Sequence, residues 1–133
     1  MNKEYYTETY ITEWKNKDNV IISLWHMNER DGTEQVGVVE LAVYKDGEHE
    51  GEALVWNLYV DKEHRHKGLA RRLMDEAHKT AKHLGAKVTA LEWSLKESPH
   101  WVIEWYYRLG YDDKEFGSGY ALMKRPLTNN TNE

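Results

Sequence analysis

The stretch from Leu58 to Met74 decides how this chain folds, and it reads LYVDKEHRHKGLARRLM. It begins at the end of an apolar, strand-like run from Ala53 to Val60. It ends inside a segment whose apolar residues recur every three or four positions, the spacing that is typical of a helix with one buried face. The sequence therefore predicts a strand, a basic turn and a helix over this stretch.

The helix is expected from Gly68 to Leu84, because its apolar residues form a single stripe along a helical surface. Gly85 follows at the position of a left-handed C-cap. His78 and His83 fall on the outer side of the stripe, so we expect both imidazoles to be solvated. The stripe consists of Leu69, Ala70, Leu73, Met74, Ala77, Ala81 and Leu84.

The remaining segments predict a mixed α/β (α+β) domain, with a largely antiparallel central sheet flanked by helices and a strand-rich N-terminal half. A second helix is expected from Pro99, with Ser98 as its N-cap, to a stop at Gly110. We expect one domain over residues 1–127 and a polar tail over 128–133. The other expected strands are Tyr5–Trp14, Val20–Trp25, Val36–Tyr44, Lys87–Leu95 and Tyr120–Lys124.

Composition excludes several function classes. The 133 residues fit one domain, and 40% hydrophobic with 12% aromatic residues argues against a disordered chain. With no cysteine, the chain has no disulfide, thiol nucleophile or cysteine-ligated zinc site. A net charge of -5 weighs against nucleic-acid and membrane partners. The first ten residues lack the apolar run of a signal peptide, so a cytoplasmic location is expected.

The basic turn is the strongest candidate for a binding site. Arg65, Lys67, Arg71 and Arg72 stand at the start of a helix, and no carboxylate occurs between His64 and Met74. Helix N-termini carry partial positive charge, so this arrangement is unfavourable unless an anion such as a phosphate binds there. The other interpretation is a solvated basic turn. Because three cations surround His64 and His66, a metal site on this pair is not expected.

Three motifs in this region resemble those of the GNAT acetyltransferase superfamily. Arg65 to Ala70 is similar to its Arg/Gln-x-x-Gly-x-Gly/Ala signature, and Leu58-Tyr59-Val60 to the end of its preceding strand. Trp105 to Tyr111 is similar to the aromatic-Tyr-x-x-Leu-Gly-Phe/Tyr ending of the next helix. The motifs occur in the family's order, and the resemblance covers roughly Ala53 to Met123.

The resemblance implies a transferase that moves an acetyl group from acetyl-CoA directly to an amine of a small molecule or peptide, without a metal. The pantetheine of acetyl-CoA would pair with the strand edge at Leu58, Tyr59 and Val60. Its pyrophosphate would bind the loop formed by Arg65, His66, Lys67, Gly68, Leu69, Ala70 and Arg71.

The resemblance also implies catalytic residues. Tyr106 stands four residues before Gly110, where the family usually carries the Tyr that protonates the departing sulfur. It is alternatively a core residue, and Tyr107, about 100° further round the helix, is the fallback. Glu92 interrupts an apolar strand, which makes it a candidate general base. Glu40 or a water chain are the alternatives.

Two other functions remain open. Where the family has its first helices, Tyr5 to Trp25 predicts strands, so the acceptor pocket is expected to be shallow or completed by a second subunit in a homodimer. A non-catalytic acyl-CoA-binding module is therefore the main alternative to an enzyme. A small nucleic-acid-binding protein that uses the basic turn is a weaker one.

Overall fold

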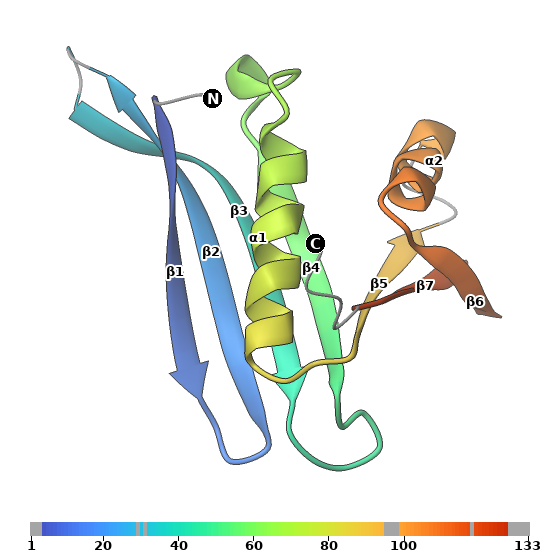
Figure 1. The fold of residues 1–133 in the computed structure, drawn as a ribbon. Helices are drawn as coiled ribbons and strands as arrows, with labels where there is room; N and C mark the ends of the chain where they lie inside the picture. Colours follow the sequence, from blue (N-terminus) through green and yellow to red (C-terminus); the bar gives the residue numbers. More distant parts are fainter. Residues whose placement is uncertain (1–3, 29, 31, 95–98, 118, 128–133) are drawn as a thin grey trace.

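The computed structural model describes residues 4–28, 30, 32–94, 99–117 and 119–127, and these form one seven-stranded sheet with two α-helices (Figure 1). The strand order is β1-β2-β3-β4-β5-β7-β6, and only β4 and β5 pair in parallel among the described residues. The elements are β1 (Tyr5–Glu13), β2 (Lys17–Asn28), β3 (Gly32–Tyr44), β4 (Glu52–Val60), the 3-10 turn η1 (Lys62–His64), α1 (Leu69–His83), β5 (Val88–Ser94), α2 (His100–Arg108), β6 (Asp112–Gly117) and β7 (Tyr120–Pro126).

This architecture confirms the expected mixed α/β fold with a largely antiparallel sheet. The N-terminal half is strand-rich as expected and forms an antiparallel meander, in which β1 turns directly into β2 without an intervening helix. One strand was not predicted, since the charged sequence of β6 lacks the alternation that marks a half-buried strand. Within the described residues β6 pairs only with β7 and lies at the edge of the sheet, where charged residues are common.

The core lies between α1 and the strands β2, β3 and β4, against which α1 packs (Figure 1). The predicted stripe is confirmed, because Leu73, Met74, Ala77 and Ala81 on α1 are completely buried. The helix ends as expected, with Gly85 at a φ of 96°. From the sheet, the core receives Val20, Ile22, Leu24, Val39, Leu41, Val43 and Val55.

The second helix is confirmed with a shifted start. Pro99 has an extended backbone and occupies the N-cap position, so the first helical residue is His100 and not Pro99 as expected. Ser98, the expected cap, lies outside the described residues, as does the tail from 128 to 133. Gly110 follows the last turn at a φ of 95°, which confirms the expected stop.

The expectation that His78 is solvated is wrong, whereas His83 is exposed as expected. His78 is 8% exposed, and its Nε2 lies 2.7 Å from the hydroxyl of Tyr111, which also lies 2.9 Å from the hydroxyl of Thr89. Burial, with a smaller effect of the nearby Arg125, lowers the pKa of His78 to about 4. The imidazole is therefore neutral and serves as a buried polar link between α1 and Tyr111 in the turn that joins α2 to β6.

None of the helices in the described part of the chain is long and apolar enough to cross a membrane.

Candidate functional site

The sheet opens between β4 and β5. These strands pair only from Glu52 to Leu54, opposite Val88 to Ala90, and beyond that point they diverge (Figure 1). The divergence leaves one edge of β4 without a neighbouring strand over the rest of its length, within the described residues. An unpaired strand edge offers backbone N–H and C=O groups to an extended ligand.

A cleft of roughly 430 Å³ lies at this opening. It draws side chains from β4 and from the later, consecutive elements β5 and α2. Of the predicted strand-edge residues, Leu58 lines the cleft, whereas Tyr59 is exposed and Val60 is buried. The lining residues are Leu54, Val55, Trp56, Asn57, Leu58, Leu91, Glu92 and Tyr106.

A bulge in β4 shapes one wall of the cleft. Asn57 has a φ of 56°, and the register of β4 against β3 shifts across it, since Glu40 pairs with Trp56 but Val38 pairs with Tyr59. A bulge bends its strand and re-aims the side chains around it. Sequence reasoning did not identify Trp56 or Asn57 as cleft residues, because nothing in the alternation of β4 marks the bulge.

The loop between β4 and α1 has the backbone of an anion site. His66 and Gly68 both have positive φ values, 65° and 77°. Gly68 is the N-cap of α1, where none of the described side chains caps the helix and no acidic residue stands in the first turn. Successive amides in such a turn, together with the positive end of a helix, favour a negatively charged ligand. A Cβ on Gly68 would meet no atom within 4 Å, so the requirement for glycine there comes from the backbone angle alone.

Two of the basic side chains in this loop are turned back onto the protein. Arg65 donates from Nε to the carbonyl of Val60 at 2.8 Å, and its guanidinium lies 5.5 Å from the ring centre of Tyr59. Lys67 donates from Nζ to the Tyr5 hydroxyl at 3.4 Å. These contacts hold the loop in place, so backbone amides are the groups that it offers most directly to an anion.

The three following residues of the predicted loop differ in exposure. Leu69 is a core residue whose side chain is buried, and Ala70 is half-buried. Arg71 is exposed, with Nε 4.0 Å from Asp75 one turn further along α1. Only Arg71 among them therefore carries a charge into solvent at the start of the helix.

The cleft brings the two predicted catalytic side chains into one site. Tyr106 on α2 and Glu92 on β5 both line it. Tyr106 packs edge-on against Trp105 and Tyr111, with ring centres 5.2 and 5.9 Å away, and burial raises the pKa of its phenol. The hydroxyl therefore keeps its proton at neutral pH and can donate it. Glu92 is exposed at the cleft, where it can accept a proton.

The alternative residues lie outside the cleft lining. Glu40 accepts a hydrogen bond of 2.6 Å from the side-chain amide of Asn57. Glu40 lies on β3, which pairs with the other edge of β4 from the one that faces the cleft. Tyr107 is exposed and does not line the cleft, as its position on the helix predicts. The geometry favours Glu92 and Tyr106 over these two residues.

The sequence matches a family model, that of the acetyltransferase (GNAT) domain, over residues 23–113. No protein of curated function matches the sequence.

Solved structures share the fold. A Klebsiella pneumoniae protein described as an acyl-CoA N-acyltransferase is 23% identical to this chain, with a TM-score of 0.63. The match covers 81% of this chain and 73% of the Klebsiella chain. The PaiA N-acetyltransferase of Thermoplasma acidophilum, solved in complex with coenzyme A, is 19% identical, with a TM-score of 0.64. That match covers 81% of this chain and 60% of the Thermoplasma chain. A GNAT-family acetyltransferase of Staphylococcus aureus has a TM-score of 0.64 at 15% identity, covering 83% and 68%. The alignment thus leaves more than a quarter of each of these chains unmatched.

The family match spans most of the sequence and agrees with the fold and the cleft: the chain belongs to the GNAT acetyltransferase family.

Proposed function

We propose that this protein transfers an acetyl group from acetyl-CoA to the amine of a small molecule or peptide. The observation that carries the proposal is the cleft between β4 and β5. It combines an open strand edge, a carboxylate and a neutral phenol, and the loop that leads to the uncapped N-terminus of α1 directly follows β4. An acyl thioester with a long polar arm and a phosphate end matches these features in order.

The acetyl-CoA would lie along β4 and the following loop. Its amide-containing pantetheine arm would hydrogen-bond to the backbone of β4 at Leu58, Tyr59 and Val60, as an added strand does. Its pyrophosphate would bind the amides from Arg65 to Arg71, which here include the left-handed turn at His66 and Gly68. Coenzyme A bound to the Thermoplasma protein of the same fold supports this co-substrate.

Glu92 is assigned the role of general base. A protonated amine has a pKa near ~10, so it must lose a proton before its lone pair can attack the thioester carbon. The exposed carboxylate of Glu92 opens to the cleft and to solvent, which lets it accept that proton directly or through water. The nitrogen–carbon bond then forms as the carbon–sulfur bond breaks, and no cysteine or metal is needed.

Tyr106 is assigned the role of proton donor to the leaving sulfur. A thiol pKa of ~8.5 lies below the ordinary phenol value of ~10, and burial raises the pKa of Tyr106 further. Full transfer from phenol to thiolate is therefore uphill, by about 2 kcal/mol or more. Tyr106 would stabilise the thiolate mainly by a hydrogen bond, and the proton released by the amine restores neutrality.

Calorimetric titration with acetyl-CoA tests the first step, and the absence of binding at high micromolar concentration would sink the proposal. Mass spectrometry of a broad amine panel then tests transfer. Tyr106→Phe should lower kcat with little change in acetyl-CoA affinity, and Tyr107→Phe serves as its matched control. Equal turnover of the two variants would remove Tyr106 from the mechanism.

A non-catalytic acyl-CoA-binding module is the second candidate. It is favoured by the direct turn from β1 to β2, since no helix stands between these strands to wall an acceptor pocket. In a homodimer, a second subunit could complete that pocket, and the protein would then be able to act as an enzyme. Tight acetyl-CoA binding without acetylation of any amine, in a protein shown to be monomeric, would favour the binding module.

The remaining expectations form part of the same proposal. The protein would act in the cytoplasm as one domain over residues 1–127, without nucleic-acid or membrane partners. An electrophoretic shift with DNA or RNA that weakens with salt would contradict the exclusion of nucleic acid.

A further inference from the structure

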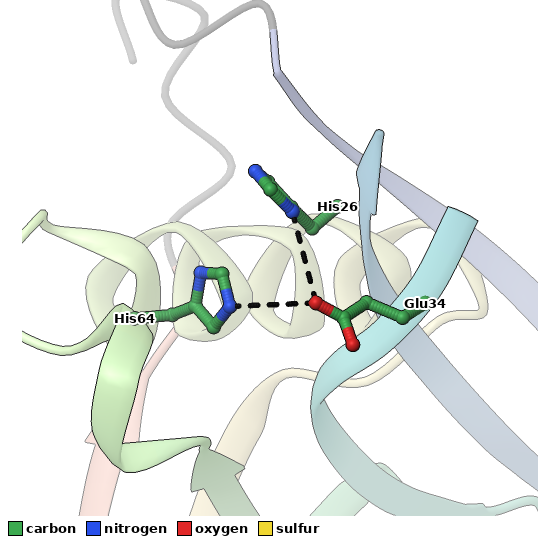
Figure 2. Close-up of side chains that lie close together, drawn as sticks. All are labelled: His26, Glu34 and His64. Atoms are coloured by element: carbon green, nitrogen blue, oxygen red, sulfur yellow. Dashed lines mark ion pairs between the residues drawn. The ribbon is translucent and has the colours of Figure 1, made fainter. Parts of the chain in front are cut away.

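His26, Glu34 and His64 converge at the end of the sheet next to η1 (Figure 2). His26 comes from β2, Glu34 from β3, and His64 is the last residue of η1. The Oε1 of Glu34 lies 3.9 Å from Nδ1 of His26 and 3.8 Å from Nε2 of His64, and the three atoms lie within 4.8 Å of one another. Two imidazoles and a carboxylate that face one point form a typical set of metal ligands.

The contact of His26 with Glu4, on the side away from Glu34, determines which ring nitrogen of His26 carries the hydrogen. Nε2 of His26 lies 3.4 Å from a carboxylate oxygen of Glu4, which accepts its hydrogen. This leaves the lone pair of the neutral ring on Nδ1. That atom is buried and has no hydrogen-bond partner among the described residues, although it points toward Glu34. A buried nitrogen with an unused lone pair costs stability unless a ligand occupies it.

The corresponding contact of His64 is with the hydroxyl of Tyr5. That oxygen lies 2.7 Å from Nδ1 of His64 and accepts a hydrogen bond from Lys67. In the tautomer that donates the Nδ1 hydrogen to Tyr5, the lone pair of His64 lies on Nε2 and faces Glu34. Metal-binding histidines in proteins commonly donate their other ring hydrogen to such an outer group.

The ligand set selects the kind of ion. Mg²⁺ and Ca²⁺ prefer oxygen ligands only, whereas two imidazoles with one carboxylate suit Zn²⁺ and similar transition-metal ions. Ligand atoms about 2.1 Å from a tetrahedral ion lie roughly 3.4 Å apart, so the two distances to Glu34 have to shorten by about half an ångström. Glu34 can provide this movement, since its side chain is 62% exposed. The two imidazole nitrogens, which lie within 4.8 Å of each other, have to approach by up to about 1.4 Å, which requires small rotations of both rings.

The charges around the cluster also permit a cation. Glu4 and Glu34 contribute two carboxylates, and Lys67 contributes one ammonium on the far side of Tyr5. Arg30 lines the same pocket as Glu4 and His26, so with both imidazoles neutral the two carboxylates balance these two cations, Lys67 and Arg30, before the ion binds. We propose that His26, Glu34 and His64 form a binding site for one divalent transition-metal ion of the zinc type, with water in the fourth position.

This site is separate from the proposed acetyl transfer, because none of its three ligands lines the cleft between β4 and β5. The ion would tie the ends of β2 and β3 to the turn that immediately precedes Arg65. Its expected role is to brace that turn, and the test does not depend on acetyltransferase activity.

Zinc titration of the full, tag-free and metal-stripped chain tests the proposal by calorimetry, with the visible absorption of bound Co²⁺ as a second readout. We expect one ion per chain. Glu34→Gln is the main variant, because Glu34 is exposed and the change leaves the fold intact. We expect Glu34→Gln and His64→Gln to weaken binding by about 100-fold or more, and Tyr5→Phe, which removes only an outer partner, by about tenfold.

Two matched controls should bind zinc as the unchanged chain does. His49→Gln alters an exposed histidine that also contacts a carboxylate, Glu52, but belongs to no three-ligand cluster in the described part of the chain. Glu8→Gln alters an exposed strand carboxylate away from the cluster. Absence of one-to-one zinc binding overturns the proposal, as does binding by Glu34→Gln and His64→Gln equal to that of the controls.

Discussion

Acidification should destabilise this protein through His78. In the folded state its pKa is about 4, and in the unfolded chain it returns to the ordinary value near 6.5. The unfolded state therefore binds more protons between these two values, so the folded state loses stability as the pH falls from 6.5 to 4. At about pH 4.5 this one group accounts for a loss of about 2.5 kcal/mol relative to pH 7.

Urea denaturation, followed by tryptophan fluorescence at a series of pH values, measures this loss. Acidic groups such as Glu52 also contribute to the pH dependence of unfolding. Burial would raise the pKa of Glu52, but hydrogen bonds from Lys124 and His49 outweigh burial and leave that pKa lowered. The unfolding free energy of the unchanged chain is therefore compared with that of His78→Gln, whose side chain retains a hydrogen-bond acceptor for Tyr111 but does not titrate. The difference in unfolding free energy between the two chains isolates His78.

We expect the free energies of the two chains to converge by about 2.5 kcal/mol as the pH falls from 7 to 4.5. His83→Gln, on the exposed side of the same helix, should show no such convergence with the unchanged chain. Parallel curves for the unchanged chain and His78→Gln would refute the assignment of a depressed histidine pKa to the buried contact with Tyr111.

Three further predictions follow from the core, the loop and the cleft. Tyr111→Phe leaves His78 and Thr89 without their shared hydroxyl, so urea denaturation should show a loss of about 1–3 kcal/mol. Gly68→Ala forces a Cβ into a left-handed conformation, which should cost about 1–2 kcal/mol in the same assay and weaken acetyl-CoA binding in calorimetry; unchanged values would contradict the strain argument. Glu92→Gln should lower kcat by about 100-fold in an acetylation assay, and an unchanged kcat would shift the role of base to Glu40 or water.

Local patterns made much of the fold predictable. The apolar stripe of α1 repeats every three or four residues, and glycines mark the ends of both helices, so these features needed no knowledge of distant contacts. The strand β6 was missed because six residues rich in charge show no alternation. Its formation depends on pairing with β7, which is a tertiary effect.

The candidate site was predictable where short motifs carried it. Glu92 and Tyr106 were named from their places in a strand and a helix, and the structure brings them to one cleft. The bulge at Asn57 was not predictable, since it depends on how β4 pairs with β3. The same limit applies to His26, Glu34 and His64, whose convergence needs the register of a hairpin and the end of a separate turn.

β4 and β5 share fewer paired residues than any other two neighbouring strands of the described sheet. The boundary separates one unit, β1 to β4 with α1, from another, β5 to β7 with α2. Three residue pairs, the ion pair of Lys124 with Glu52 at 2.7 Å and the contact of His78 with Tyr111 cross it, and both units contribute to one hydrophobic core. Local opening should begin at this boundary, where few backbone bonds resist it. A ligand in the cleft touches both units, so its binding should slow amide hydrogen exchange in β5 as well as in β4.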